Sequence, residues 1–330
     1  MVKQITWVAV MAMLAVSAQA INWDNGGVGN AWSNPTNWVG DNVPDNNTEA
    51  AAFVGAANVA IDVDQDFAIK DYTDGFGGAG FTHTLYGAGT LTIDVNSAAN
   101  SDGIKNSTGN AGGTLRFNGN VAINNSGVGR TYVRNNNSSG NTTLFDTDST
   151  LTLNSILQTL PAAGGSIQFN GTLASSSANL LIGSDNVSFG AGHDSSGFGS
   201  DIVFLAGAKL AVDGGTVLNT GRKIQVNGSG ELELNGANAI NGANLVVGGA
   251  NNLLIDANSN QDDMGLLTFG SGTVTLDLAE DVSGIAFDDS SAQTWGAGAF
   301  VISNFTAGVV SFGIDANGLL VEQLGKIQAY

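Results

Sequence analysis

The sequence predicts an all-β protein that folds as a right-handed parallel β-helix, or β-solenoid, with capped ends. Three observations support this fold class. Short segments of alternating apolar residues recur along the chain, clusters of Gly, Asn, Ser and Asp separate them, and one five-residue pattern repeats. Glycine is abundant, with 47 residues among 330, whereas there are 3 prolines. One elongated repetitive unit fits this composition better than several globular domains.

Each alternating segment is typical of a strand with one buried face. In residues 91–95, the apolar side chains at alternate positions point to one side, and Thr92 and Asp94 point to the other. After Ala20, helical periodicity is confined to a weak candidate at 319–327. The comparable strand segments are 115–117, 151–153, 167–169, 210–212, 224–226, 232–234 and 274–278.

A small-small-apolar-polar-apolar pattern recurs along the chain at irregular spacings. Many of these spacings suit one coil of a solenoid, which takes roughly 20 to 24 residues, and loop insertions absorb the longer ones. Roughly a dozen coils stacked about 4.8 Å apart would form a rod on the order of 60 Å long. We expect outward Asn and Thr side chains to form ladders along this rod. The repeats lie at 89–93, 113–117, 149–153, 165–169 and 272–276.

The start of the chain, at 1–20, has the features of a bacterial signal peptide. Lys3 is followed by an apolar stretch at 7–16 and by the small residues of Ser17-Ala18-Gln19-Ala20, so we expect cleavage after Ala20. The apolar stretch is too short to span a bilayer, which predicts secretion without membrane insertion of the mature chain. Cysteine is absent, so disulfides and thiolate metal sites are excluded.

The charge of the chain narrows its expected partners. There are 10 basic and 29 acidic residues, which give a formal net charge of −19. Such a chain repels nucleic acid and anionic membrane surfaces, so neither is an expected partner. The same charge favours solubility and attracts divalent cations.

The open coil edges at the two ends of a solenoid invite aggregation, so caps are expected there. We therefore divide the chain into a signal peptide at 1–20, an N-terminal Trp-containing cap with the first strands at 21–60, solenoid coils at 61–265 and a C-terminal solenoid and capping module at 266–330.

Trp23, Trp32 and Trp38 lie close together in the sequence, among Asn, Asp and Gly. The favoured interpretation is that these large apolar rings cover the hydrophobic end of the first coil. The alternative is carbohydrate binding, in which the rings stack on sugar faces while neighbouring amides hold the hydroxyl groups.

Two sets of short segments, one near each end of the mature chain, form a distinctive pattern. They are Trp23-Asp24, Trp32, Asn37-Trp38, Pro44 and 50–53 near the start, and 266–269, 273–278, 285–295, 302–305, 312–313, 318–320 and 323–324 near the end. In these segments the chain resembles secreted bacterial proteins that carry autotransporter-associated β-strand repeats, and its end is similar to the terminal module of repeat proteins with a Pro-Glu-Pro sorting tail. The resemblance implies a right-handed β-helix, an extracellular location and no known catalytic residues. The sorting tail itself is missing after Tyr330, which favours free secretion or self-assembly.

Few groups of side chains in the sequence are candidates for metal binding or catalysis. Asp62, Asp64 and Asp66 alternate along one predicted strand, so their carboxylates point to one side and are the best candidates for a calcium site. His83 and His193 each stand among small and polar residues, and we expect both on the surface. Neither belongs to a metal-binding or nucleophile motif.

A weak basic patch is the main candidate for enzymatic chemistry. Arg130 and Arg134 flank Tyr132, with Lys105 and Arg116 nearby, if neighbouring coils bring these side chains together. Solvated side chains that discourage edge pairing explain them more simply.

Together these observations favour a secreted structural or adhesive protein of the cell surface or extracellular matrix, without enzymatic activity. Its expected partners are further copies of itself, joined end to end or laterally into filaments, or a surface polysaccharide. A carbohydrate-binding module is the first alternative. A polysaccharide-active β-helix enzyme is the second, by analogy of fold.

Overall fold

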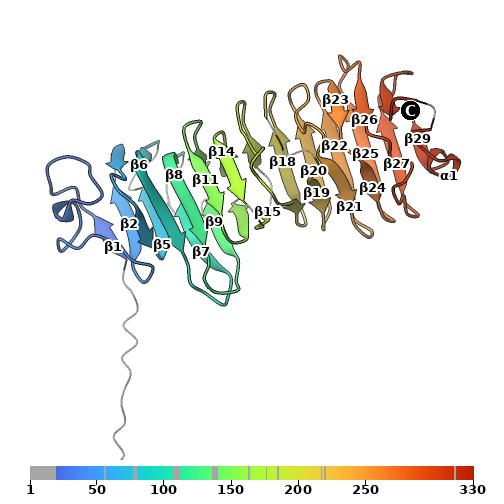
Figure 1. Cartoon of the computed structure of the whole chain (residues 1–330). Helices are drawn as coiled ribbons and strands as arrows, with labels where there is room; N and C mark the ends of the chain where they lie inside the picture. Colours follow the sequence, from blue (N-terminus) through green and yellow to red (C-terminus); the bar gives the residue numbers. More distant parts are fainter. Residues whose placement is uncertain are drawn as a thin grey trace, which may run out of the picture.

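The computed structural model describes residues 20–330 apart from 56, 77–79, 107–111, 136–139, 163, 176, 184–185, 217, 219–220 and 316. The predicted signal peptide at 1–20 therefore lies outside the described residues, except for Ala20. Figure 1 shows an elongated rod in which successive segments follow one another along its length. No described helix is long and apolar enough to cross a membrane.

The rod is a parallel β-solenoid, as the sequence predicts. Every strand pair within its sheets is parallel in the described part of the chain, and strands that follow one another in a sheet are about one coil apart in the sequence. The first sheet has 11 strands: β1 (Ile21–Trp23), β2 (Ala50–Gly55), β5 (Asp71–Phe76), β7 (Ser101–Asn106), β9 (Thr131–Asn135), β12 (Leu157–Pro161), β15 (Leu180–Ile182), β17 (Ile202–Phe204), β19 (Lys223–Val226), β21 (Asn244–Val247) and β24 (Leu267–Phe269).

The second sheet, of 15 strands, runs beside the first along the rod. Its long strands β6 (Thr82–Asp94) and β8 (Thr114–Asn124) pair with each other, and each also pairs with two shorter strands. The remaining strands are β3 (Val59–Asp62), β4 (Phe67–Ile69), β10 (Thr142–Phe145), β11 (Thr150–Leu153), β13 (Ser166–Phe169), β14 (Thr172–Ser175), β16 (Val187–Phe189), β18 (Ala208–Val212), β20 (Gly230–Leu234), β22 (Leu253–Ala257), β25 (Thr273–Leu278), β27 (Ala299–Ser303) and β29 (Ile327–Ala329).

A short third sheet covers the remaining side near the end of the chain. It contains β23 (Gln261–Met264), β26 (Ile285–Phe287) and β28 (Val310–Phe312). The described helices are equally short: the 3-10 helix η1 (Pro35–Asn37) and α1 (Val321–Leu324), which falls inside the weak helical candidate of the sequence.

The pairing register between strands explains the spacing of the repeats in the sequence. Phe204 pairs with Val226, and Val226 pairs with Val247, so a coil in the second half takes about 20 residues. Coils in the first half are longer, as the pairing of Leu85 with Phe117 shows. The irregular spacing of the sequence repeats therefore reflects loops of different length around one constant strand stack.

The core is continuous because alternate side chains point inward in every coil. Phe117, Phe145 and Phe169 occupy the same position in successive coils, with ring centroids 5.0 and 5.1 Å apart and nearly parallel planes. All three rings are fully buried. Their spacing is close to the distance between neighbouring strands, so the register itself stacks the rings.

The predicted surface ladders are present in part. Asn258 Nδ2 donates to Asn235 Oδ1 at 3.0 Å between exposed side chains of consecutive coils. The hydroxyl groups of Thr142 and Ser166 lie 3.1 Å apart on neighbouring strands. The structure also contains a ladder of buried amides, which the sequence does not predict.

Candidate functional site

The three N-terminal tryptophans form the cap of the first coil. Trp23, Trp32 and Trp38 are 7%, 0% and 1% exposed, and the Trp32 and Trp38 rings meet edge to face at 4.7 Å. Trp32 Nε1 donates to the carbonyl of Pro44 at 3.1 Å, and Trp38 Nε1 to the carbonyl of Trp32 at 2.8 Å. The buried rings present no open face to a sugar, so the geometry favours the capping interpretation over carbohydrate binding.

The predicted calcium ligands are occupied by contacts between coils. Asp64 accepts hydrogen bonds from the backbone and hydroxyl of Ser33, and Asp66 accepts one from the Thr90 backbone at 2.8 Å. Asp62 exchanges backbone hydrogen bonds with the cap segment around residues 30–32. No three His, Cys, Asp or Glu side chains are arranged to hold a metal in the described part of the chain. Asp64 through its carboxylate and Asp62 through its backbone therefore link the first coil to the cap, and Asp66 links that coil to the next.

The expectation that both histidines lie on the surface is wrong. His83 is 1% exposed, and its Nδ1 lies 2.9 Å from Oδ1 of the fully buried Asp74. Tyr72 directs its hydroxyl to the same carboxylate at 3.3 Å. Burial raises the pKa of Asp74, while its bonds to His83 and Tyr72 oppose that rise. Alternation places His83 on the inner face of β6, and its polar neighbours in the sequence belong to the outer face.

His193 is also buried, but without an acidic hydrogen-bond partner among the described residues. Its ring stacks on Phe189 at a centroid distance of 4.2 Å, and its Nε2 contacts the Ser195 hydroxyl. Burial lowers the pKa of His193 to about 4, although a backbone bond to Gly171 and the charge of Asp194 oppose this. Ser195 is 1% exposed, so a substrate has no access to this Ser-His pair.

A buried amide ladder continues from Asp74 along the corner between the first and second sheets. Asp74, Asn106 and Asn135 are partners in consecutive strands and are almost completely buried. Asn135 Nδ2 donates to the carbonyls of Asn141 and Ser166 at 3.1 and 2.6 Å. These bonds tie the corner segments of neighbouring coils together, beside the backbone bond from Ser166 N to the Asn141 carbonyl at 2.9 Å.

The basic residues of the sequence separate onto two sheets. Lys105 and Arg134 are direct partners on the outer face of the first sheet, beside Tyr132. Arg116 lies on the second sheet and pairs with Asp146. The structure thus brings Lys105, Tyr132 and Arg134 onto neighbouring strands, with Arg130 directly before β9, and Arg116 does not join them.

An acidic column follows the outer face of the second sheet. Glu233, Asp256 and Asp277 are partners in β20, β22 and β25, and Glu231 and Glu233 bind Lys209 at 2.6 and 3.0 Å. Partial burial, followed by the neighbouring carboxylates, raises the pKa of Asp256. The matching triplets at 232–234, 255–257 and 276–278 are the sequence signal for this column.

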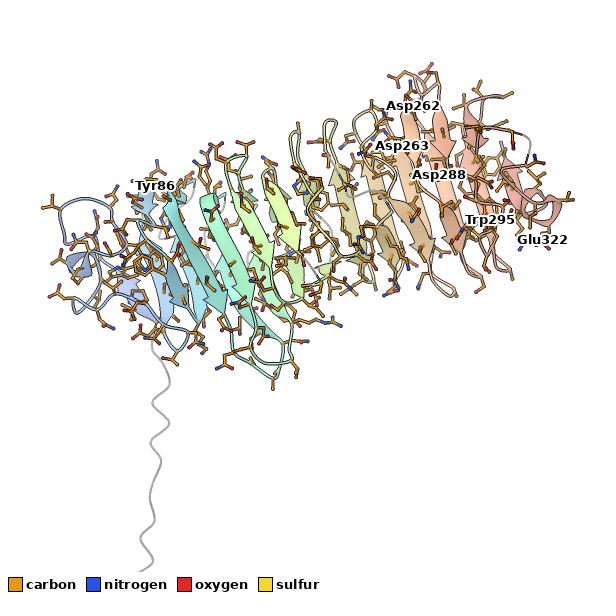
Figure 2. All side chains as sticks on the ribbon, viewed as in Figure 1. Tyr86, Asp262, Asp263, Asp288, Trp295 and Glu322 are labelled. Atoms are coloured by element: carbon orange, nitrogen blue, oxygen red, sulfur yellow. The ribbon has the colours of Figure 1, made fainter. Side chains whose placement is uncertain are left out.

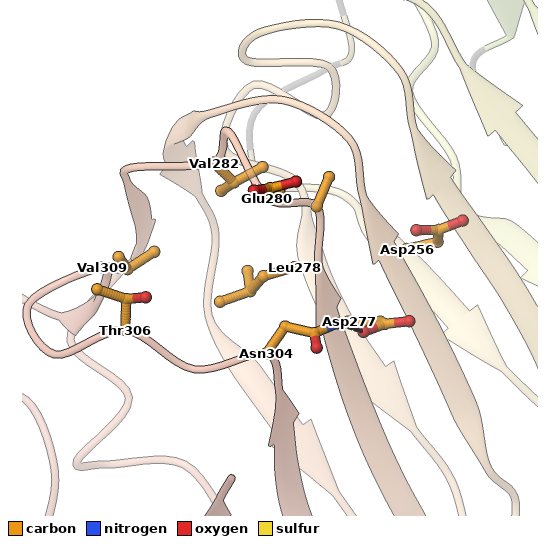
Figure 3. Close-up of a pocket in the computed structure, with 9 residues that line it drawn as sticks. Asp256, Asp277, Leu278, Glu280, Val282, Asn304, Thr306 and Val309 are labelled. Atoms are coloured by element: carbon orange, nitrogen blue, oxygen red, sulfur yellow. Dashed lines mark hydrogen bonds between the residues drawn. The ribbon is translucent and has the colours of Figure 1, made fainter.

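A groove of about 510 Å³ adjoins the last part of this column. Figure 3 shows Asp256 and Asp277 on adjacent strands, with Asn304 hydrogen-bonded to Asp277 at 2.9 Å and Glu280 on the loop above. The opposite side is closed by the segment at 306–309.

A second set of carboxylates lies on the third sheet and the loops that follow it. Asp262, Asp263 and Asp288 gather along the edge of the rod in Figure 2. Partial burial and the charge of Asp263 raise the pKa of Asp288, which places these two groups close to each other.

The C-terminal end of the rod carries apolar surface. A hollow of about 310 Å³ lies among β27, β28, α1 and β29, lined mainly by apolar side chains. The apolar side chains that are between 40% and 86% exposed here are Phe305, Leu320, Val321, Leu324 and Tyr330.

Comparison of the chain with protein-family models, curated proteins and solved structures finds no match.

Proposed function

We propose that the protein is a secreted structural or adhesive component of the cell surface or extracellular matrix, and that its rods join through their C-terminal ends. The observation that carries this proposal is the difference between the two ends of the solenoid. One end is covered by its own cap, whereas the other presents a strand edge together with apolar side chains.

The N-terminal end is closed by backbone hydrogen bonds. Trp23 and Trp38 form an antiparallel bridge, and Val39 N donates to Asn22 O at 2.8 Å, which covers the outer edge of β1. On the second sheet, the segment at 30–32 exchanges backbone hydrogen bonds of 2.8 Å with Asp62 at the end of β3. A strand of another chain therefore has little edge to pair with along β1.

The C-terminal end of the rod has both an unpaired strand edge and exposed apolar side chains. β29 is the last strand of the second sheet and pairs only with β27 among the described residues. The apolar hollow and the exposed side chains of α1 lie next to it. An unpaired strand edge beside exposed apolar surface is a template for association.

Two such ends are expected to meet tail to tail. A head-to-tail filament needs two open ends, and at the N-terminal end the cap covers β1 and the end of β3. In a two-fold arrangement, β29 of one rod pairs antiparallel with β29 of a second copy, and the assembly closes as a dimer. The result is a rod of about twice the length, with a cap at each outer end.

The test uses the mature chain, residues 21–330, in analytical ultracentrifugation and negative-stain electron microscopy. We expect a concentration-dependent dimer and rods of doubled length. Val321→Asp should weaken dimerisation at least tenfold, because it places a charge in the apolar contact. Val28→Asp is the matched control, since Val28 is 97% exposed at the other end. Monomers at all concentrations, or an equal effect of both variants, would contradict tail-to-tail pairing.

A further inference from the structure

We propose that the outer face of the first sheet binds a carboxylated polysaccharide through Lys105 in β7, Arg134 in β9, and Lys70 and Arg130, which directly precede β5 and β9. We call this surface the basic face. Such binding would give the proposed extracellular role a partner, and it rests on that role only for the location of the protein. Its chemistry is independent of how the rods associate.

The basic face concentrates the scarce cations of the chain. These four residues are among only 10 Lys and Arg in the sequence, yet they all fall within residues 70–134. Asp71 and Asp102, on the same strands, balance two of the four charges, so the face keeps a positive surplus. The whole chain has a net charge of −19, so the remainder is even more acidic. Such a concentration of positive charge on an acidic rod points to an anionic partner.

The side chains are positioned by the strand register. Lys105 and Arg134 are partners in β7 and β9, and Asp102 is the partner of Tyr132. Arg134 lies over the Tyr132 ring, with its guanidinium carbon 5.2 Å from the ring centroid. Its Nε binds Asp102 at 2.7 Å. These two contacts fix the guanidinium on the surface before any ligand arrives.

Asp71 and Asp102 leave part of the positive charge of the basic face free to bind a ligand. Lys105 has no hydrogen bond or ion pair with any residue that the structure describes. Arg130 donates from Nη1 to Oε1 of Gln158 at 3.1 Å, and this neutral amide orients the guanidinium without neutralising it. The contact of Arg134 with Asp102 uses Nε, which leaves the two Nη groups directed elsewhere.

Carboxylates match this arrangement for a geometric reason. The planar guanidinium fork binds a carboxylate with two parallel hydrogen bonds, which a neutral hydroxyl cannot match. Successive strands present their side chains about 4.8 Å apart, so the donors form a row rather than a point. A linear polymer with an acid group on each sugar presents a complementary row.

The acidic column of a second copy is the rival partner. Lys209 lies between Glu231 and Glu233 at 2.6 and 3.0 Å and already compensates one end of that column. A polyuronate has no cation of its own that neutralises its carboxylates. The polysaccharide is therefore the partner that the charges favour, and self-association becomes an outcome of the test.

The experiment measures binding of the mature chain to polygalacturonate and to the same polymer after reduction of its carboxyl groups. We expect binding to polygalacturonate only. Lys105→Ala combined with Arg134→Ala should weaken it at least tenfold. The control combines Arg222→Ala and Lys223→Ala, which removes the same charge from two exposed residues far along the rod. The single variant Lys105→Glu serves as a second test, because the Lys105 side chain makes no hydrogen bond or ion pair with the described residues, and it should also weaken binding.

Ionic strength provides an independent readout. The Debye length is about 30 Å at 0.01 M salt, about 8 Å at 0.15 M and about 3 Å at 1 M. The net negative charge should therefore oppose binding at the lowest salt, the basic face should dominate near 0.15 M, and binding should be lost at 1 M.

Three results would overturn the proposal. They are equal binding of the reduced polymer, equal weakening in the control variant, and salt-sensitive self-association without polymer binding. The tail-to-tail dimer is measured without polymer, so dimerisation and polymer binding fail separately.

Discussion

The two halves of the rod close the same corner, between the first and second sheets, by different means. In the first half, the corner loops after β7 and β9 are long, and their backbone groups bind the buried side chains of Asn106, Asn135 and Asn141. In the second half the corners are short and rich in glycine. A Cβ added to Gly228 would lie 2.4 Å from the backbone nitrogen of Ala206, and one added to Gly272 would meet the backbone of the preceding coil even more closely.

The same corner therefore needs a hydrogen-bonding side chain in one half of the rod and no side chain in the other. A long corner needs added hydrogen-bonding groups, because its polar backbone is buried away from the strand ladder. A short corner needs the absence of a side chain, because the backbones of consecutive coils touch there. In the long corners after β7 and β9, Gly112 and Gly140 have φ angles of 78° and 86°, and a Cβ added to Gly112 would have nothing within 4 Å.

The largest expected effect is at the amide ladder. Asn135→Leu removes two donated bonds and the one that Asn135 Oδ1 accepts from Thr143 at 2.6 Å, which leaves buried polar groups without partners. We expect the free energy of unfolding of the first half to fall by about 4 kcal/mol. Urea unfolding combined with hydrogen exchange locates the loss. Asn227→Leu, at an exposed corner of the second half, should change it by less than about 0.5 kcal/mol.

The second largest effect on stability concerns the buried histidines, whose surroundings differ between the two halves. His83 faces Asp74, whereas His193 has no acidic hydrogen-bond partner in the described structure and a pKa lowered to about 4. The unfolded chain therefore binds more protons between pH 6.5 and 4, so stability is lost as the pH falls through that window, by about 3 kcal/mol. Urea midpoints between pH 7 and 4 measure this loss. His193→Phe should flatten the dependence by the same amount, and an unchanged slope would contradict the assignment.

The smallest effect is at the glycine corners. Gly228→Ala forces the corner away from Ala206, and we expect a loss of about 2 kcal/mol, confined to the second half. Gly197→Ala is the matched control, because nothing lies within 4 Å of its added Cβ and its φ is not positive. Thermal unfolding of both variants measures the difference. A neutral Gly228→Ala would mean that the coils separate there at little cost.

The sequence predicted the fold well because strand alternation and the repeat are local signals. Residues 115–117, 167–169 and 274–278 lie in strands with the expected faces buried. The buried polar groups were missed because His83 and Asn135 sit among polar neighbours, and only the phase of the alternation marks them as inward.

Features that depend on register between coils were harder to predict. Loops of different length obscure that register, since Ile167 pairs with Val187 whereas Leu85 pairs with the much more distant Phe117. The acidic column was missed for this reason. Lys105, Arg130 and Arg134 were grouped from the sequence, but Lys70 was missed. Arg116 was included although it lies on the second sheet, because the sheet of each residue follows from the same register.

The connection of coils along one axis also determines how the rod responds to force. In Figure 1 the cap and α1 lie at opposite ends, so tension between them acts along the inter-strand hydrogen bonds and peels off one coil at a time. A coil of about 20 residues would release roughly 70 Å of extended chain. A tether built in this way lengthens in steps and dissipates mechanical work while the remaining coils stay folded.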